Sequence, residues 1–393
     1  MSRSLESRPE PTTVPSGTAV PSGTDGVSDV DADLARLRAE IDRVDRELLA
    51  RLNERAGFVQ EVGRVKARTG RAVYSAARER DMLAALRAGN PGPLPDAAVE
   101  PLFREIISAT RELERRLRIA YLGPEGTFGH EVARRSFGAF VDLVAVSPIA
   151  EIFAAVERGD ADHGVAPVEN TTQGVVTETL DTLATSEVAP CGELLLRVSY
   201  HLLSRSGALE DVERVASHPQ GLAQCRQWLD RHLPGVERVE TSSTAAAARL
   251  AADDGAVAAV ASPVAGETYG LVPAARAIED RRDNTTRFLV IGRTPVARSG
   301  ADLTSVVFTV RKTEPGALHR LLEPFAAHGV NLTSIQSRPM PGKPFEYLFF
   351  LDLEGHRDDA AVRAALADAA AHAHSHRVIG SFPRAGASEG EGS

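Results

Sequence analysis

Apolar residues in the first part of the chain recur every three or four positions, as they do on one face of an amphipathic helix. Between Asp33 and about Arg68 no proline interrupts this repeat, so one long helix is predicted. Shorter repeats predict a second helix from about Ala76 to Arg87 and a third from about Asp96 to Arg116. The apolar face of the long helix consists of Leu34, Leu37, Ile41, Val44, Leu48, Leu52, Val59 and Val62.

After Arg118 the pattern changes to short apolar runs separated by turns and helical segments, which is typical of alternating α/β structure. The expected strands are 119–122, 141–146, 163–167, 198–203, 212–216, 257–261 and 288–291. The last part is predicted to follow the ferredoxin-like order βαββαβ. Its expected strands are 305–311, 331–338, 346–353 and 378–382, with helices at 316–328 and 358–371. The chain is thus divided into an all-α domain (33–117), an α/β domain (118–298) and a ferredoxin-like domain (303–384).

The composition agrees with several domains, because 393 residues exceed what one hydrophobic core usually accommodates. The net charge of −9 and the lack of a basic block argue against nucleic acid as a partner. Cys191 and Cys225 form no CxxC pair, which gives no zinc site and favours a reducing compartment. No run is long and apolar enough for a signal peptide or a membrane span, so a cytoplasmic protein without a membrane partner is expected. Residues 1–32 and 385–393 are poor in large apolar side chains and are expected to be disordered.

Two positive side chains, Arg55 and Lys66, interrupt the apolar face of the long helix. At a rise of about 1.5 Å per residue they point the same way about 16 Å apart, so both can reach one small dianion. Arg38 lies about 26 Å from Arg55 on a different face, and it reaches the same ligand only from a partner helix. This spacing predicts an intertwined dimer.

These residues resemble the all-helical chorismate mutase family over roughly residues 33–117. The matching segments are Leu37-Arg38, Glu54-Arg55, Val62-Gly-Arg-Val-Lys66, Arg78-Glu79 and Phe103-Arg-Glu-Ile-Ile107. The resemblance implies a chorismate site made of Arg38 from the other subunit together with Arg55, Lys66, Arg78 and Glu79. It also places Thr110 and Glu114, four residues apart on the third helix, in that site.

Rearrangement of chorismate to prephenate is pericyclic and needs a compact bound conformer and donors to an ether oxygen, without a nucleophile or a cofactor. Glu114 stands where some family members have Gln, and a carboxyl group donates to that oxygen only when it is protonated. Mutase activity is therefore expected to fall as the pH rises. Ser75 stands where the family often has Asp, which leaves one contact open.

The α/β region carries a series of short polar motifs. In chain order they are Tyr121-Leu-Gly-Pro-Glu-Gly-Thr-Phe128, Pro167-Val-Glu-Asn-Thr171, Ser217-His-Pro-Gln220, Ser242-Ser-Thr-Ala-Ala246 and Asn284-Thr-Thr-Arg-Phe288. Together these motifs resemble prephenate dehydratase. The resemblance implies a two-lobed α/β domain similar to type II periplasmic binding proteins, with the site in its cleft. The reaction converts prephenate to phenylpyruvate by loss of CO2 and water, and neither a metal nor a cofactor is expected.

The dehydratase resemblance assigns Thr286 to the departing hydroxyl, and we assign Arg287 to the pyruvyl carboxylate because a guanidinium binds carboxylates bidentately. Asn170 and Glu169 are expected to line the cleft, where Glu169 is either an acid or a residue that orients Arg287. Ser243 and Thr244 stand at a predicted helix start, where their hydroxyls form a second anion site or simply cap the helix.

In the last domain Gly316-Ala-Leu318 opens a predicted helix, and Ser337 and Arg338 end a predicted strand. With these residues the domain resembles the ACT regulatory domain of the same enzyme over about residues 303–384. This resemblance implies that phenylalanine binds between paired domains as a feedback inhibitor. His319 and Gln336 replace a usual Val and Glu, and the loss of the carboxylate weakens attraction to an ammonium group.

Together the three resemblances imply a bifunctional enzyme of phenylalanine biosynthesis that acts on chorismate and prephenate as a homodimer or higher oligomer. Alternatives are a dehydratase with a decayed mutase domain, or a ligand-binding regulator with a helical DNA-binding head, which the acidic charge opposes. A prephenate dehydrogenase would need a dinucleotide site, but the glycines at 123, 126 and 129 are spaced GxxGxxG rather than GxGxxG.

Overall fold

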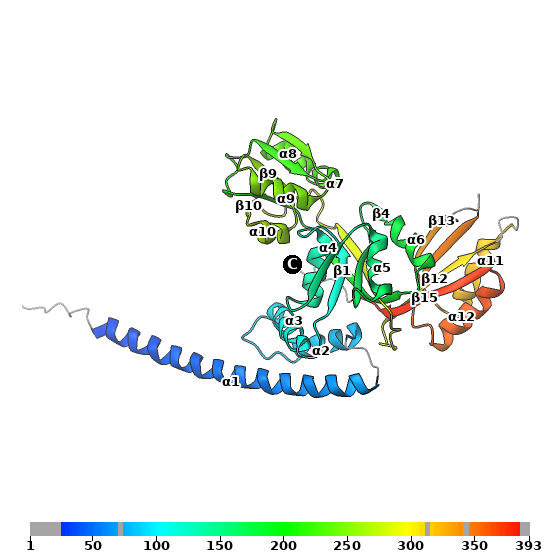
Figure 1. Ribbon diagram of the computed structural model, residues 1–393, viewed down its shortest axis with the longest axis horizontal. Helices are drawn as coiled ribbons and strands as arrows, with labels where there is room; N and C mark the ends of the chain where they lie inside the picture. The colour runs from blue at the N-terminus through cyan, green and yellow to red at the C-terminus, as the bar shows by residue number, and fades with distance from the viewer. Residues whose placement is uncertain (1–24, 70–73, 311–314, 341–345, 386–393) are drawn as a thin grey trace, which may run out of the picture. The chain divides into compact units, whose positions relative to one another are not determined.

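The computed structural model describes residues 25–69, 74–310, 315–340 and 346–385 (Figure 1). Its first element, α1 (Asp25–Thr69), is the long helix that the apolar repeat predicts. The helix begins at Asp25 rather than Asp33, so the expectation of disorder is wrong for residues 25–32. The rest of the predicted tails, residues 1–24 and 386–393, lies outside the described residues.

Two shorter helices follow, α2 (Ala76–Ala88) and α3 (Asp96–Glu112). The Ser75 hydroxyl caps α2 by accepting a hydrogen bond from the backbone N–H of Arg78. The third helix ends at Glu112, earlier than the predicted Arg116. The reason is the next domain: Leu117 is 2% exposed in its core, and the first strand begins one residue later.

The α/β region consists of two lobes. The first lobe is a mixed sheet of order β2-β1-β3-β11-β5, with β4 paired to the end of β3. Its strands are β1 (Arg118–Leu122), β2 (Asp142–Val146), β3 (His163–Asn170), β4 (Gly174–Val175), β5 (Ala189–Arg197) and β11 (Thr285–Gly292). One face packs on α4 (Phe128–Phe137) and the other on α5 (Ile149–Arg158) and α6 (Thr177–Thr185).

The second lobe lies entirely between β5 and β11 in the sequence and has a sheet of order β10-β6-β9-β7-β8. Its strands are β6 (His201–Ser204), β7 (Arg214–Ser217), β8 (Glu237–Glu240), β9 (Val257–Ala261) and β10 (Val272–Ala275). Its helices are α7 (Pro219–Gln224), α8 (Arg226–His232), α9 (Thr244–Asp253) and α10 (Pro263–Tyr269). The chain passes between the lobes twice, once after β5 and once before β11. These two segments lie side by side, since Val198 N–H donates to the Asn284 carbonyl at 2.8 Å.

The last domain has the predicted βαββαβ order and a sheet of order β13-β14-β12-β15. Its elements are β12 (Asp302–Thr309), α11 (Ala317–Ala327), β13 (Leu332–Pro339), β14 (Tyr347–Glu354), α12 (Ala360–Ala371) and β15 (Ser375–Pro383). One face of this sheet packs on α11 and α12, and the other shares a hydrophobic core with α5 and α6 of the first lobe. The predicted architecture of a helical domain, a two-lobed α/β domain and a ferredoxin-like domain is confirmed.

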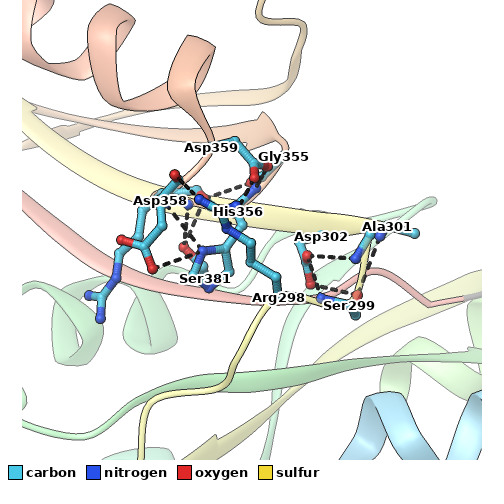
Figure 2. Close-up of polar contacts among 12 residues, drawn as sticks. Arg298, Ser299, Ala301, Asp302, Gly355, His356, Asp358, Asp359 and Ser381 are labelled. Carbon is cyan, nitrogen blue, oxygen red and sulfur yellow. Dashed lines mark hydrogen bonds and ion pairs between the residues drawn. The ribbon is translucent and has the colours of Figure 1, made fainter.

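A cluster of polar contacts fixes the connection between β11 and β12 to the last domain (Figure 2). The Asp302 carboxylate accepts from the backbone N–H groups of Ser299 and Gly300 at 2.8 and 3.2 Å. His356, which is 3% exposed, donates from Nε2 to the Val296 carbonyl at 3.1 Å, because its Nδ1 accepts from a backbone N–H. Arg298 pairs with Asp359 at 3.3 Å. These contacts give the connection a fixed geometry.

The sequence pattern missed β4, β5, β8 and β10. The most consequential of these is β5, where Pro190 and Gly192 obscure an otherwise apolar run although the strand pairs along the whole length of β11. Within the described residues no helix is long and apolar enough to cross a membrane.

Candidate active sites

The ends of β3 and β11 bring together the two central residues of the α/β motifs. These strands are antiparallel neighbours, and Thr286 pairs with Asn170. Paired residues of antiparallel strands project to the same face. Asn170 Nδ2 donates to Thr286 Oγ1 at 2.9 Å and to Asn284 Oδ1 at 2.8 Å. Thr286 is half-buried rather than sealed in the core, whereas Asn170 is 7% exposed.

The hydrogen-bond chain continues into the second lobe. Asn284 Nδ2 donates to Gln224 Oε1 at 2.9 Å, so a residue at the end of α7 reaches the residue that directly precedes β11, the strand that carries Thr286. Gln224 Nε2 is buried and has no hydrogen-bond partner among the described residues. A buried amide donor without a partner is unusual and marks a place where a ligand oxygen can bind. Gln224 was missed by the sequence analysis, because it lies at the helix end after the Ser-His-Pro-Gln motif rather than within it.

This network determines what the Thr286 hydroxyl can do. A hydroxyl has one donor and two acceptor positions. Since Asn170 Nδ2 can only donate, Thr286 Oγ1 accepts in this bond and keeps its own proton for another partner. The Asn170 side chain is itself held in this orientation, because its Oδ1 accepts from the N–H groups of Thr172 and Gln173 at 2.9 and 3.1 Å.

Arg287 does not share this face, which corrects its assignment as the carboxylate anchor. Successive side chains of a strand point to opposite faces, so the neighbour of Thr286 points away from it. Arg287 Nε pairs with Glu193 at 2.5 Å and Nη1 pairs with Asp352 of β14 at 2.7 Å. Burial lowers the pKa of Arg287, but the nearby Asp352 and Glu193 carboxylates outweigh this and raise it overall. The guanidinium is therefore already neutralised by two carboxylates.

Glu169 also lies away from Thr286, which corrects its expected place in the cleft. The register of β3 against β11 shifts between Arg287 and Phe288, so that Val168 and Glu169 both lie opposite Arg287. Such a bulge turns two successive side chains to one face. Glu169 accordingly lines a cavity together with Arg287 and Asp352, between the first lobe and the last domain.

Ser243 and Thr244 lie at the start of α9, as expected. Ser243 Oγ accepts from the Ala246 N–H at 3.0 Å, which is the capping role, and Thr244 is 8% exposed. The Tyr121–Phe128 motif forms the turn into α4, where the Tyr121 ring stacks on His130. The Tyr121 hydroxyl is buried without a partner among the described residues, and burial lowers the pKa of His130.

In the helical domain, Arg38 is exposed and Arg55 half-buried in the part of α1 before Val59. The apolar face there is also open to solvent, with Leu37 50%, Ile41 59% and Leu48 55% exposed. An exposed apolar stripe of this length is typical of a surface that binds another protein.

The remaining mutase residues belong to the part of the chain from Val59 onward. Lys66 is half-buried and Arg78 is exposed. Glu79, which is 8% exposed, is not a free carboxylate: it pairs with Arg111 and, at 3.7 Å, with Arg104. The Arg111 guanidinium lies over the Tyr74 ring at 5.2 Å, so this ion pair is part of the packing of α2 on α3.

Thr110 and Glu114 are not on one continuous helix, since α3 ends at Glu112. The Thr110 hydroxyl donates to the Ile106 carbonyl at 2.7 Å. Glu114 Oε2 is buried without a hydrogen-bond partner among the described residues. Its side chain lies against α1 at Gly63, where an added Cβ would be 2.8 Å from Glu114 Cγ. A glycine is needed there for Glu114 to approach α1.

In the last domain, Gly316 caps α11 with a positive φ of 76°, and Ala317 and Leu318 form the first turn. Ser337 and Arg338 lie on opposite faces of β13, as successive strand residues do. Ser337 is exposed, whereas Arg338 pairs with Asp181 of α6 at 2.7 Å. Only one of the two therefore faces the side of α11.

Within the described ranges, no group of three or more histidine, cysteine or acidic side chains is arranged to hold a metal ion.

Comparison with known proteins gives a consistent result for all three regions. Family models match at residues 37–115 for chorismate mutase type II, 119–296 for prephenate dehydratase and 304–371 for the ACT domain. A bifunctional chorismate mutase/prephenate dehydratase from Aquifex aeolicus is 44% identical over 90% of this chain and 98% of its own length.

Two solved structures are similar over 68% of this chain, each with a TM-score of 0.63. One is the prephenate dehydratase of Arthrobacter aurescens in complex with L-Phe, which is 36% identical over 90% of that chain. The other is the quorum-quenching acylase GqqA, which is 29% identical over 98% of that chain. Shape alone thus does not separate a dehydratase from an acylase, and function must be argued from the site.

Proposed function

The chain belongs to the family of bifunctional chorismate mutase/prephenate dehydratases, and from that premise we propose which of its residues carry out each reaction. The enzyme isomerises chorismate to prephenate and then converts prephenate to phenylpyruvate, with phenylalanine as the effector of its ACT domain. We assign residues 33–117 to the mutase, 118–298 to the dehydratase and 303–384 to the ACT domain.

The dehydratase reaction is centred on Thr286. The bond between the ring and its carboxylate breaks, its electron pair completes the aromatic ring, and the C4–O bond breaks. The leaving oxygen gains negative charge and takes up one proton from solvent to depart as water, so a hydrogen-bond donor aimed at it stabilises the transition state. Thr286 supplies that donor, because Asn170 occupies one of its acceptor positions and leaves its proton free. This hydrogen bond is the observation that carries the assignment.

The unpartnered Nε2 of Gln224 supplies a second donor from the other lobe. Gln224 contacts the first lobe through Asn284, so closure of the lobes around prephenate places both donors on one substrate. Removal of water from such a site strengthens both hydrogen bonds. We assign a carboxylate of the substrate to the α9 start at Ser243 and Thr244, where backbone N–H groups point outward from the helix.

The mutase site holds the chorismate carboxylates with Arg55, Lys66 and Arg78, and Glu114 donates to the ether oxygen when protonated. Arg38 comes from a second copy of the chain. Support for the dimer is the exposed apolar face of α1, including Leu37 and Ile41, which a second α1 helix would bury. Glu79 and Thr110 belong to this site through the family resemblance, although Glu79 already pairs with Arg111.

Feedback inhibition by phenylalanine at Gly316, Ala317, Leu318 and Ser337 completes the proposal. Both cysteines are buried and unpaired, which supports a cytoplasmic location.

The test is to supply purified protein with chorismate and to follow prephenate and phenylpyruvate over time. The variant Thr286→Ala should accumulate prephenate at the wild-type rate and form phenylpyruvate at least about 10²-fold more slowly, as expected for the loss of one preorganised donor. Formation of phenylpyruvate at the wild-type rate would show that Thr286 is not the donor. An absence of prephenate from chorismate in the wild type would mean that the mutase domain has decayed.

A further inference from the structure

One face of strand β11 carries a residue of the proposed dehydratase site, and the other face carries a residue that contacts the ACT domain. Thr286 faces Asn170 and the second lobe, and Arg287 faces the ACT domain. Neighbouring residues of a strand are only about 3.3 Å apart, so a force that shifts Arg287 also shifts Thr286. β11 pairs with β3 on one side and β5 on the other, which keeps it a rigid element.

The Arg287 guanidinium joins the two domains. Its partner Glu193 lies on β5 of the same lobe, and its partner Asp352 lies on β14 of the ACT domain. The side chains are 15%, 7% and 14% exposed for Arg287, Glu193 and Asp352, so solvent screens them little. Asp352 is also fixed within its own sheet, because Ser305 Oγ donates to its other oxygen. A shift of the ACT sheet therefore displaces Asp352 and, through the ion pair, the Arg287 guanidinium.

A second ion pair joins the same two domains, with its arginine in the ACT domain and its carboxylate in the first lobe. Arg338 lies on β13 next to Ser337, and its guanidinium reaches Asp181 of α6 at 2.7 and 3.2 Å. Helix α6 begins just after β4, and β4 pairs with β3 at Glu169 and Asn170. The Asp181 contact thus holds the hairpin that ends in Asn170, the hydrogen-bond partner of Thr286.

Strand β13, which carries Ser337, pairs directly with β14, which carries Asp352. Ser334 of β13 pairs with Asp352 of β14, and Ser334, Gln336 and Arg338 share the face toward the dehydratase domain. Ile335 and Ser337 occupy the other face, on the side of α11. Because both faces belong to one strand, a ligand at Ser337 cannot move β13 without moving the dehydratase-facing residues.

The space between the two domains allows such a movement. Glu169, Arg287, Asp352, Ser305 and Gln336 line a cavity, whereas the surrounding core is closely packed. Packed interiors resist displacement, and open space beside a charged pair lets it shift between two arrangements.

We propose that the pairs Arg287–Asp352 and Arg338–Asp181 transmit the effector signal from the ACT domain to Thr286 and Asn170, with Arg287 as a positioning residue rather than a substrate ligand. This inference rests on the proposed function, since it concerns regulation of the same dehydratase site. Phenylalanine binding shifts the β13–β14 pair, and the two bridges pull β11 and the β3–β4 hairpin with it.

The test compares Asp352→Asn and Asp181→Asn with the full-length wild type. In Asp352→Asn, Arg287 keeps Glu193 as its counter-ion, so the arginine is not left as an isolated buried charge. Calorimetry measures phenylalanine binding, and kcat and KM for prephenate are measured with and without phenylalanine. We expect both variants to bind phenylalanine and to turn over prephenate as the wild type does, and each to lose about fivefold or more of the phenylalanine effect. Asp352→Glu should restore that effect.

Asp368→Asn is the matched control. Asp368 lies on α12 and pairs with His328 within the ACT domain, so the same chemical change there should leave inhibition intact. Full inhibition of Asp352→Asn overturns the proposal, and so does loss of phenylalanine binding together with inhibition. If Asp352→Asn does not fold, the test rests on Asp181→Asn. The Asp181 side chain is 39% exposed, and a substitution at such a surface position is tolerated. Unchanged inhibition by phenylalanine in Asp181→Asn refutes the proposed role of the two ion pairs. A wild-type enzyme that turns over but ignores phenylalanine contradicts the proposed regulation itself.

Discussion

Replacement of Asn170 by aspartate should reverse the polarity of the hydrogen bond on which the dehydratase mechanism depends. In the wild type Asn170 Nδ2 donates to Thr286 Oγ1 at 2.9 Å and to Asn284 Oδ1 at 2.8 Å. Aspartate has nearly the same shape and still accepts from the Thr172 N–H, but an ionised carboxylate offers no donor. Thr286 would then donate its proton to Asp, in a charge-assisted bond stronger than one to a neutral partner.

The size of the effect follows from the loss of one preorganised donor. Removal of such a donor typically lowers kcat by about 10²–10³, which corresponds to about 3–4 kcal/mol. The mutase reaction should not change, because none of the Asn170 contacts involves the helical domain. A protonated Asp regains a donor, so the dehydratase activity of Asn170→Asp should recover as the pH falls.

Separate assays of chorismate and prephenate turnover test this, with Thr286→Val as the matched control that removes the hydroxyl at constant shape. If both changes act through one hydrogen bond, the double variant should be no slower than Thr286→Val alone. A wild-type kcat for Asn170→Asp would refute the reasoning. Multiplicative losses in the double variant would also refute it, because they would show that the two residues act independently.

Three further predictions follow from the other sites. Burial lowers the pKa of His163 to about 4, so the folded state favours the neutral imidazole. This contribution to the free energy of unfolding is lost as the pH falls from about 6.5 toward 4. In urea unfolding, the free energy of unfolding of His163→Gln should therefore fall by about 2 kcal/mol less than that of the wild type between pH 7 and 5. Glu114→Gln keeps a donor at every pH, so its mutase pH profile should be flat where that of the wild type declines; a profile that still declines removes Glu114 from the reaction. Gly63→Ala should displace Glu114 and reduce mutase kcat while dehydratase kcat stays constant, and equal losses in both would indicate unfolding instead.

Sequence patterns were sufficient for elements whose apolar residues repeat regularly. The long helix α1 and the βαββαβ order of the ACT domain follow from such repeats, because each buries one continuous face. The pattern was insufficient for β5, where Pro190 and Gly192 break the apolar run although the neighbouring strand β11 supplies the hydrogen bonds. It also placed the end of α3 too late, since a helix end set by tertiary packing at Leu117 leaves no local signal.

The candidate site was predictable to the extent that its residues lie within short motifs. Asn170 and Thr286 belong to two such motifs, and the structure brings them together across β3 and β11. Gln224 reaches the same network from another lobe, and no spacing in the sequence relates it to Asn284. Glu79 was expected to face a substrate, but its partner Arg111 lies on another helix and could not be identified from a repeat.

Arg287 shows why neighbouring polar residues should not be assigned to one ligand without the strand boundaries. The apolar run predicted a strand over 288–291, which leaves Thr286 and Arg287 in a turn where both could point the same way. The strand in fact begins at Thr285, because β3 and β5 continue to pair with β11 beyond the apolar residues. Within a strand, the two-residue period sends Thr286 and Arg287 to opposite faces. A guanidinium on the far face needs buried carboxylates, and these came from β5, which the pattern missed, and from a separate domain. Because residues 285–287 belong to the strand, Arg287 points away from the substrate and toward the ACT domain.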